Sequence, residues 1–151
     1  MSAVVSAPVR QANWERAGGR CEYCLMHEDD GTLPHQPDHI IAAQHGGEPV
    51  LENLALACCR CNWLKGPNLA SVDPVTRERA WVFNPRRHRW ADHFKLDGGK
   101  IIGVTAIGRA TVFLLQFNLP DRVRLRRELQ RNGRYPRAEQ RGEIPLPSQP
   151  T

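Results

Sequence analysis

The sequence has no long hydrophobic run. None of its apolar stretches approaches the roughly 20 residues that a helix needs to cross a bilayer. The first eight residues also lack the charged and apolar regions of a signal peptide. These absences argue against an integral membrane protein, so we expect a cytoplasmic protein with no membrane partner.

Cysteine is scarce and odd in number, with five among 151 residues. Because the cytoplasm keeps thiols reduced, we expect these cysteines to bind metal rather than to form disulfides. The hydrophobic content of 40% is enough for a modest core, and the length favours one domain of ordinary size.

Basic residues are few in the first half of the chain. Residues 71–151 contain 16 Lys and Arg against 8 Asp and Glu, a net charge of +8, whereas residues 1–70 contain 5 against 8, a net charge of −3. Since a positive surface attracts polyanions, we expect the second half to hold an anionic partner.

Two cysteine pairs dominate the first half. Cys21 and Cys24 form one Cys-x-x-Cys turn, Cys58 and Cys61 form another, and 33 residues separate the pairs. Two such turns supply the four sulfur ligands of a structural Zn²⁺ site. Cys59 has the wrong spacing and is expected to be a buried or semi-buried free thiol, while a nearby histidine, either His27 or His35, remains an alternative ligand.

The local patterns predict an α+β fold. Around the cysteine pairs we expect a helix over 8–18, a strand over 38–42, a strand over 51–57 for which a helix is also possible, and a short helix over 60–65 ended by glycine. Further on we expect a strand over 79–83, a hairpin with its turn at 97–99, an apolar helical stripe at 110, 113, 114 and 117, and a basic helix over 121–131.

Several motifs between the first cysteine pair and Gly66 resemble those of the HNH endonucleases, a ββα-metal family. They are Asp38-His39-Ile40-Ile41, His45-Gly46-Gly47, Glu52-Asn53-Leu54 and the segment from Cys61-Asn62 to Gly66. The resemblance covers roughly the first 45% of the chain and implies a zinc-stapled ββα core that hydrolyses phosphodiester bonds. Residues 83–94 and 108–111 are similar to the tail of small, stand-alone bacterial members.

The resemblance also implies roles for single residues. His39 would be the general base, because an imidazole is suited to take a proton near pH 7. Asp38 would bind the catalytic metal and Asn53 would orient the base. Asn62 matches the last motif position, where many members have histidine, so the chain is an H-N-N variant. Two hard oxygen ligands favour Mg²⁺ or Mn²⁺.

The basic residues predict contacts with DNA, with double-stranded DNA as the expected form. Arg86, Arg87 and Arg89 stand beside Trp90, which is a composition typical of nucleic-acid contacts. Lys65 on the short helix and Arg122 and Arg126 on the last helix are further candidates. Either arginine cluster is alternatively a solvated face, and Tyr23 and Trp63 are interpreted as packing residues rather than base-stacking ones.

We therefore interpret the chain as an HNH endonuclease in three parts. Residues 1–70 would be the nuclease core with its zinc knuckle, residues 71–133 a basic extension packed on that core, and residues 134–151 a flexible tail. The alternative is a zinc-dependent nucleic-acid-binding module without turnover. The sequence leaves open the form of the substrate, its sequence preference, the biological role and the oligomeric state.

Overall fold

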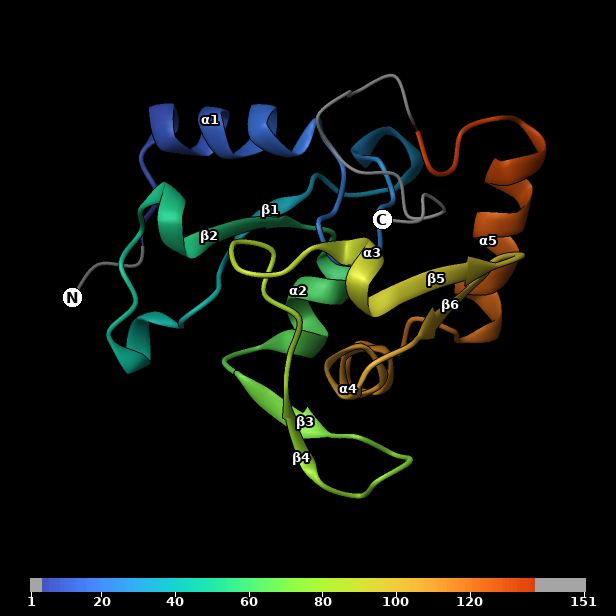
Figure 1. The fold of residues 1–151 in the computed structure, drawn as a ribbon. Coiled ribbons are helices and arrows are strands. Elements are labelled where there is room, and N and C mark those ends of the chain that lie inside the picture. The colour runs from blue at the N-terminus through green and yellow to red at the C-terminus, as the bar shows by residue number, and fades with distance from the viewer. Residues whose placement is uncertain (1–3, 138–151) are drawn as a thin grey trace.

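The computed structural model describes residues 4–137 (Figure 1). Its helices are α1 (Ala7–Ala17), α2 (Cys59–Lys65), α3 (Trp90–His93), α4 (Ala106–Leu114) and α5 (Pro120–Arg131). Its strands are β1 (Gln36–His39), β2 (Leu54–Ala57), β3 (Ala70–Val72), β4 (Arg79–Trp81), β5 (Phe94–Asp97) and β6 (Lys100–Gly103). The strands pair in order as three two-stranded antiparallel sheets, which confirms the α+β class.

Helix α1 begins and ends where its sequence predicts. The Ser6 side chain accepts a hydrogen bond from the Val9 amide, and Pro8 occupies the first turn, where its missing N–H costs nothing. At the other end Gly18 takes a left-handed conformation with φ of 63°. The following chain therefore turns sharply into the first cysteine pair.

The β1–β2 sheet lies between α1 and α2, and both helices contact both strands (Figure 1). Its register pairs Asp38 with Ala55 and His39 with Leu54. The expected helix over 60–65 is confirmed as α2. The first strand ends at His39 and does not reach residue 42, and the second begins only at Leu54.

The late start of β2 corrects one prediction. Asn53 was expected in the second strand, but it lies in a 3₁₀ turn over Leu51–Asn53. Its side-chain amide bonds to the backbone of the preceding loop, as Asn commonly does in turns.

Two hairpins and two helices follow. The predicted strand over 79–83 is shorter and forms β4. The predicted hairpin turn is confirmed, since β5 ends at Asp97 and β6 begins at Lys100, with Gly98 at a φ of 58°. The basic helix is α5, and the chain turns again at Asn132 and Gly133.

The predicted apolar stripe is wrong in part. Helix α4 ends at Leu114, and Gln116 has a positive φ of 49° that redirects the chain. Phe113 lies on the helix and is 61% exposed. Phe117 lies beyond the end of the helix, is buried and packs against Phe94 with ring centroids 5.9 Å apart.

One hydrophobic cluster joins the two halves of the chain. It contains the buried cysteines, Tyr23 and Ile40 together with aromatic residues from Phe83 to Tyr135. The Trp90 indole donates a 2.8 Å hydrogen bond to the Tyr23 carbonyl. The cysteine turns therefore share their core with α3, β5 and α5.

The expected flexible tail is corrected for residues 134–137. Tyr135 is buried, and its hydroxyl donates a 2.7 Å hydrogen bond to the Cys24 carbonyl. Arg134 and Arg137 form ion pairs with Asp30. Residues 138–151 lie outside the described part of the chain.

Between residues 4 and 137, the helices are all too short or too polar to cross a membrane.

Candidate functional site

The four cysteines of the two pairs converge on one point. Cys21 and Cys24 lie in the turn after α1, Cys58 caps α2 and Cys61 lies in its first turn. Their sulfur atoms all lie within 4.8 Å of one another, with 3.8 Å between those of Cys24 and Cys58. Tetrahedral zinc with Zn–S distances of about 2.3 Å places sulfurs about 3.8 Å apart. These residues therefore fit a structural zinc ion.

Backbone amides and neighbouring thiols affect the sulfur atoms of the four cysteines. The Cys24 amide donates to the Cys21 sulfur and the Cys61 amide to the Cys58 sulfur, each at 3.5 Å. Burial raises the pKa of the Cys21 and Cys61 thiols, whereas hydrogen bonds with the neighbouring thiols lower the pKa of Cys24. A divalent cation at this site would supply the positive charge that keeps all four groups as thiolates.

The alternative ligands have other partners. His27 accepts a hydrogen bond at Nδ1 from the Asp29 amide, and His35 Nε2 lies 2.9 Å from the Met26 carbonyl oxygen. Within the described residues, the potential metal cluster consists of the four cysteines alone. Cys59 is exposed at the start of α2, so the expectation of a buried or semi-buried thiol was wrong.

Arg122 of α5 contacts the cysteine cluster. Its Nη2 donates to the Cys61 sulfur at 3.2 Å, and its Nη1 donates to the carbonyl oxygens of Leu115 and Gln116 at 2.7 and 3.2 Å. Burial opposes the charged form of Arg122, but the thiol groups of Cys61 and Cys24 raise its pKa above the ordinary value. Its guanidinium can therefore offset the negative charge of a zinc-thiolate centre.

This burial corrects the expected DNA contacts on α5. Arg126 is buried as well, and it donates at 2.6 Å to each of the carbonyl oxygens of Gly99 and Phe117. Arg122, Arg126 and Leu129 form the inner face of the helix, whereas Arg124 and Arg127 face solvent. The two predicted residues therefore hold the fold together and cannot reach a phosphate.

Asp38 lies in β1, one residue before the end of the strand, and is 4% exposed. Its Oδ2 accepts a 2.8 Å hydrogen bond from the Tyr23 hydroxyl and lies 3.2 Å from Lys65 Nζ. Burial raises the pKa of the Asp38 carboxyl, and Lys65 opposes this shift. Oδ1 has no hydrogen-bond partner among residues 4–137 and is not fully buried, so it is the oxygen that can bind a metal.

Lys65 is the last residue of α2 and is only 1% exposed. Its ammonium also donates to the carbonyl oxygens of His39 and Ile40 at 3.4 and 3.2 Å. The expected contact between Lys65 and a DNA phosphate is thus replaced by a structural role, in which the ammonium ties Asp38 and the end of β1 to α2.

Tyr23 contacts a candidate site residue, Asp38, although the sequence interpretation described it only as a packing residue. It is buried, as expected, but its hydroxyl also orients Asp38. No spacing rule connects a residue inside a cysteine turn with a carboxylate 15 positions later, so the sequence contains no signal for this contact.

His39 is the last residue of β1 and is partly exposed. Its Nε2 is buried without a hydrogen-bond partner in the described part of the chain. Its Nδ1 has no partner among these residues either but is not fully buried, which leaves that nitrogen in contact with solvent. The imidazole can therefore exchange a proton with a water molecule at this surface.

Asn53 fixes the loop that follows His39. Its Oδ1 accepts from the Ile41 amide at 2.9 Å, and its Nδ2 donates to the carbonyl oxygens of Ile41 and Glu48, each at 3.0 Å. Ile41 is two residues beyond His39. Asn53 therefore acts on the backbone that carries the imidazole and has no hydrogen bond to the ring itself.

Asn62 lies on α2 beside an exposed aromatic residue. Its side chain is partly exposed and makes no hydrogen bond within residues 4–137, so its amide oxygen is available. Trp63 is 84% exposed, so the interpretation of this residue as a packing residue was wrong.

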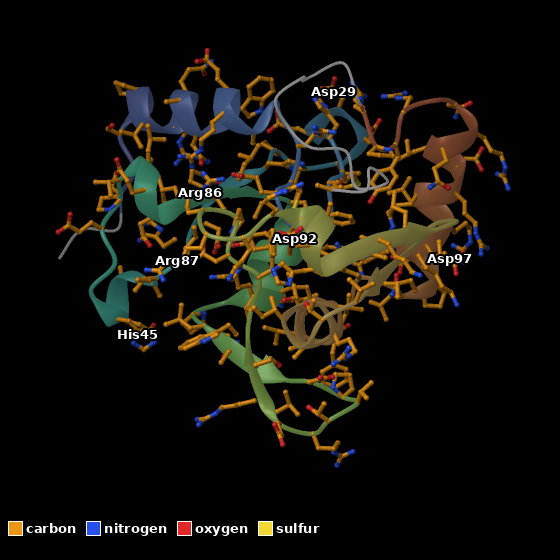
Figure 2. The ribbon with its side chains drawn as sticks, viewed as in Figure 1. Asp29, His45, Arg86, Arg87, Asp92 and Asp97 are labelled. Atoms are coloured by element: carbon orange, nitrogen blue, oxygen red, sulfur yellow. The ribbon has the colours of Figure 1, made fainter. Side chains whose placement is uncertain are left out.

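The arginines after β4 differ in their surroundings. Arg86 pairs with Glu22 and donates to the Leu54 carbonyl oxygen at 3.2 Å, so its charge is already compensated. Arg87 and Arg89 are exposed. Figure 2 shows Arg86 and Arg87 on the side of the molecule that also carries His45. Arg87 and Arg89 are therefore the members of this cluster that can meet a polyanion.

Comparison with known proteins gives one match. Residues 21–68 match the family model described as HNH endonuclease. This range begins at the first cysteine and contains Asp38, His39, Asn53 and Asn62. No curated protein and no solved structure matches the chain.

Proposed function

Because residues 21–68 form an HNH domain, we propose that the protein is a metal-dependent endonuclease that hydrolyses phosphodiester bonds of DNA. The observation that supports this most strongly lies at the end of β1. There His39, with a solvent-facing imidazole nitrogen, follows Asp38, whose Oδ1 has no hydrogen-bond partner among residues 4–137.

His39 is the general base in this proposal. Its accessible Nδ1 takes a proton from the attacking water, and such a group contributes typically 10²–10⁴-fold in rate. Asn53 positions it by holding the backbone at Ile41. A misplaced base loses much of its effect, because proton transfer requires hydrogen-bond distance.

Asp38 and Asn62 are the proposed ligands of the catalytic cation. Both offer oxygen atoms, and hard oxygen ligands suit Mg²⁺ or Mn²⁺ better than thiophilic ions. The cation would stabilise the negative charge that builds on the phosphate. Tyr23 and Lys65 hold Asp38 through its other oxygen, so they are positioning residues in this arrangement.

The zinc ion has a structural part in the proposal. The four cysteines join the turn after α1 to the start of α2, and these segments flank the sheet that carries His39. Metal-binding free energy at such a site contributes directly to folding. The zinc would keep α2 and β1 at the separation that Asp38 and Asn62 require.

We propose that DNA is held by exposed arginines of the second half of the chain. Arg87 and Arg89 follow β4, and Arg124, Arg127 and Arg131 lie on the outer face of α5. These side chains replace the buried Arg122, Arg126 and Lys65 as candidates. Phosphate contacts of this kind fix the position of a protein on DNA without reading its sequence.

A binding module without turnover is the second candidate, and one observation favours it. The Lys65 ammonium lies 3.2 Å from Asp38 Oδ2, so the protein itself supplies a cationic partner for this carboxylate. If Lys65 remains the partner of Asp38 and no catalytic cation binds there, then DNA would be bound but not cleaved.

Metal-dependent cleavage separates the two candidates. Purified full-length protein is incubated with supercoiled plasmid in Mg²⁺, in Mn²⁺ and in a chelator. We expect nicked or linear DNA with either cation and intact plasmid with the chelator. The Asn62→Ala variant tests the proposed metal ligand. It should cleave the plasmid more slowly than the wild type, and a higher Mn²⁺ concentration should partly restore its cleavage rate. Binding without cleavage of plasmid, single-stranded or branched DNA in either cation would favour the second candidate.

A further inference from the structure

A cavity of about 390 Å³ opens next to the end of β1. Its lining includes Ile40 and Ile41, which follow β1, and Trp81, Asn84 and Arg87 from the end of β4 and the segment after it. Lys65 also lines it, and the Lys65 ammonium bonds to the carbonyl oxygens of His39 and Ile40. One of the residues that line the cavity, Ile40, therefore follows His39 directly in the chain.

Trp81 makes one wall of this cavity and is 63% exposed. It is the last residue of β4, and its partner across the β3–β4 hairpin is Ala70, which is too small to cover an indole ring. Leu69 and Ile41, both also exposed, line the same cavity. Such an arrangement offers a flat aromatic surface with apolar edges.

Polar groups at the cavity complement a nucleotide. Arg87 is exposed and carries the charge that a phosphate requires. The Asn84 Oδ1 accepts from the Arg86 amide at 2.9 Å, while its Nδ2 has no partner among residues 4–137. That amide nitrogen is a free donor for the acceptors on a base edge.

We propose that this cavity receives one nucleobase turned out of its strand beside the cleaved phosphodiester. The base would stack on Trp81 while Arg87 contacts a neighbouring phosphate. This inference rests on the proposed nuclease function and specifies its preferred substrate as DNA with an unpaired nucleotide near the cleaved bond. An unpaired base is favoured because turning out a paired base requires the loss of its pairing and stacking.

Binding measurements test this inference separately from catalysis. The full-length chain carrying His39→Ala, which is expected to bind without cleaving, is titrated into a fluorescent duplex with one unpaired adenine and into the same duplex fully paired. We expect tighter binding to the duplex with the unpaired base. Adding Trp81→Ala should weaken binding to that duplex by about 5- to 150-fold, the range for loss of one base-aromatic stack.

Two further variants make the comparison specific. Trp81→Phe should retain most of the preference, because a phenyl ring still stacks. Trp63→Ala is the matched control, since Trp63 is exposed but does not line the cavity, and it should leave the ratio of the two affinities unchanged. Circular dichroism of each variant verifies that the fold is intact.

Three results would overturn the inference. They are equal affinity of the parent chain for the two duplexes, an equal loss on both duplexes in Trp81→Ala, and no loss on either. No loss of affinity on either duplex in Trp81→Ala would mean that the cavity does not bind nucleic acid. Cleavage of paired plasmid by the wild-type protein together with any of these would retain the proposed function while excluding the base site, whereas failure to bind any DNA would contradict both.

Discussion

Lys65 Nζ lies 3.2 Å from Asp38 Oδ2, and both side chains are almost completely buried. A buried ion pair of this kind contributes little net stability as a pair, but removing one partner leaves the other charge without compensation. We predict that Lys65→Met lowers the free energy of unfolding by about 3–5 kcal/mol, measured by urea denaturation near neutral pH.

The double variant Asp38→Asn/Lys65→Met is the control. It removes both charges and should recover much of the loss. If Lys65→Met is as stable as the wild type, then the two groups do not form a buried pair.

The same pair predicts a pH dependence. Burial already raises the pKa of the Asp38 carboxyl, and loss of Lys65 would raise that pKa further. A group whose pKa is higher in the folded state favours folding only while it is protonated, so its contribution is lost as the pH rises through the folded pKa. Lys65→Met should therefore lose stability relative to the wild type as the pH rises from about 4 to about 7. A constant difference across this range would contradict the assignment.

Arg122 should control zinc retention. Its guanidinium donates to the Cys61 sulfur, and groups that bond to metal ligands typically contribute about 10–100-fold to metal affinity. We expect one zinc per chain in the purified wild-type protein and a zinc affinity lower by this factor in Arg122→Met, measured by competition with a chromophoric chelator. Arg124→Met, on the exposed face of the same helix, is the matched control and should bind zinc normally. Equal zinc affinity in the two variants would show that Arg122 is only a packing residue.

Arg87 and Arg89 should contribute to DNA affinity through charge. Each phosphate neutralised on duplex DNA contributes a slope of about −0.9 in log affinity against log salt concentration. The double variant Arg87→Ala/Arg89→Ala should therefore flatten the slope by up to about 2 units, measured by fluorescence anisotropy at several salt concentrations. Arg86→Ala, which loses the ion pair with Glu22, should change stability more than the slope. An unaltered slope in the double variant would mean that DNA is held elsewhere.

The zinc cluster and the β1–α2 unit were predictable because their signals are local. A Cys-x-x-Cys turn fixes the distance between its own two sulfurs, and the spacing of Cys58 and Cys61 also marks the start of α2. The strand that carries Asp38 and His39 was also predicted, although it was expected over 38–42 and instead ends at His39.

The roles of the basic residues were less predictable, because they depend on which face of a helix is covered. On α5, Arg122 and Arg126 are separated by four positions and share a buried face with Leu129, and Arg122 on that face contacts the cysteine cluster. The intervening Arg124 has the same chemistry but faces solvent. Nothing in the composition of the helix distinguishes the two sets, since the distinction comes from contacts such as that of Arg122 with Cys61, which lies 61 positions earlier in the chain.

Trp63 and Lys65 on α2 also show that the buried face of a helix could not be predicted from its own sequence. A tryptophan is usually buried and a lysine usually exposed, but here the lysine is 1% exposed and the tryptophan 84%. The helix is only seven residues long, so its apolar pattern is too short to determine its orientation. Lys65 is buried because Asp38 and two carbonyl oxygens satisfy its charge.

The most direct test of the nuclease proposal is plasmid cleavage by His39→Ala in Mg²⁺ or Mn²⁺, with DNA affinity and zinc content measured on the same preparation. Since His39 is proposed to act as the base and holds neither the zinc nor the phosphate backbone, we predict a cleavage rate lower by at least about 10²-fold, with affinity and zinc content close to those of the wild type. Cleavage by His39→Ala at the wild-type rate would contradict the assignment of this site.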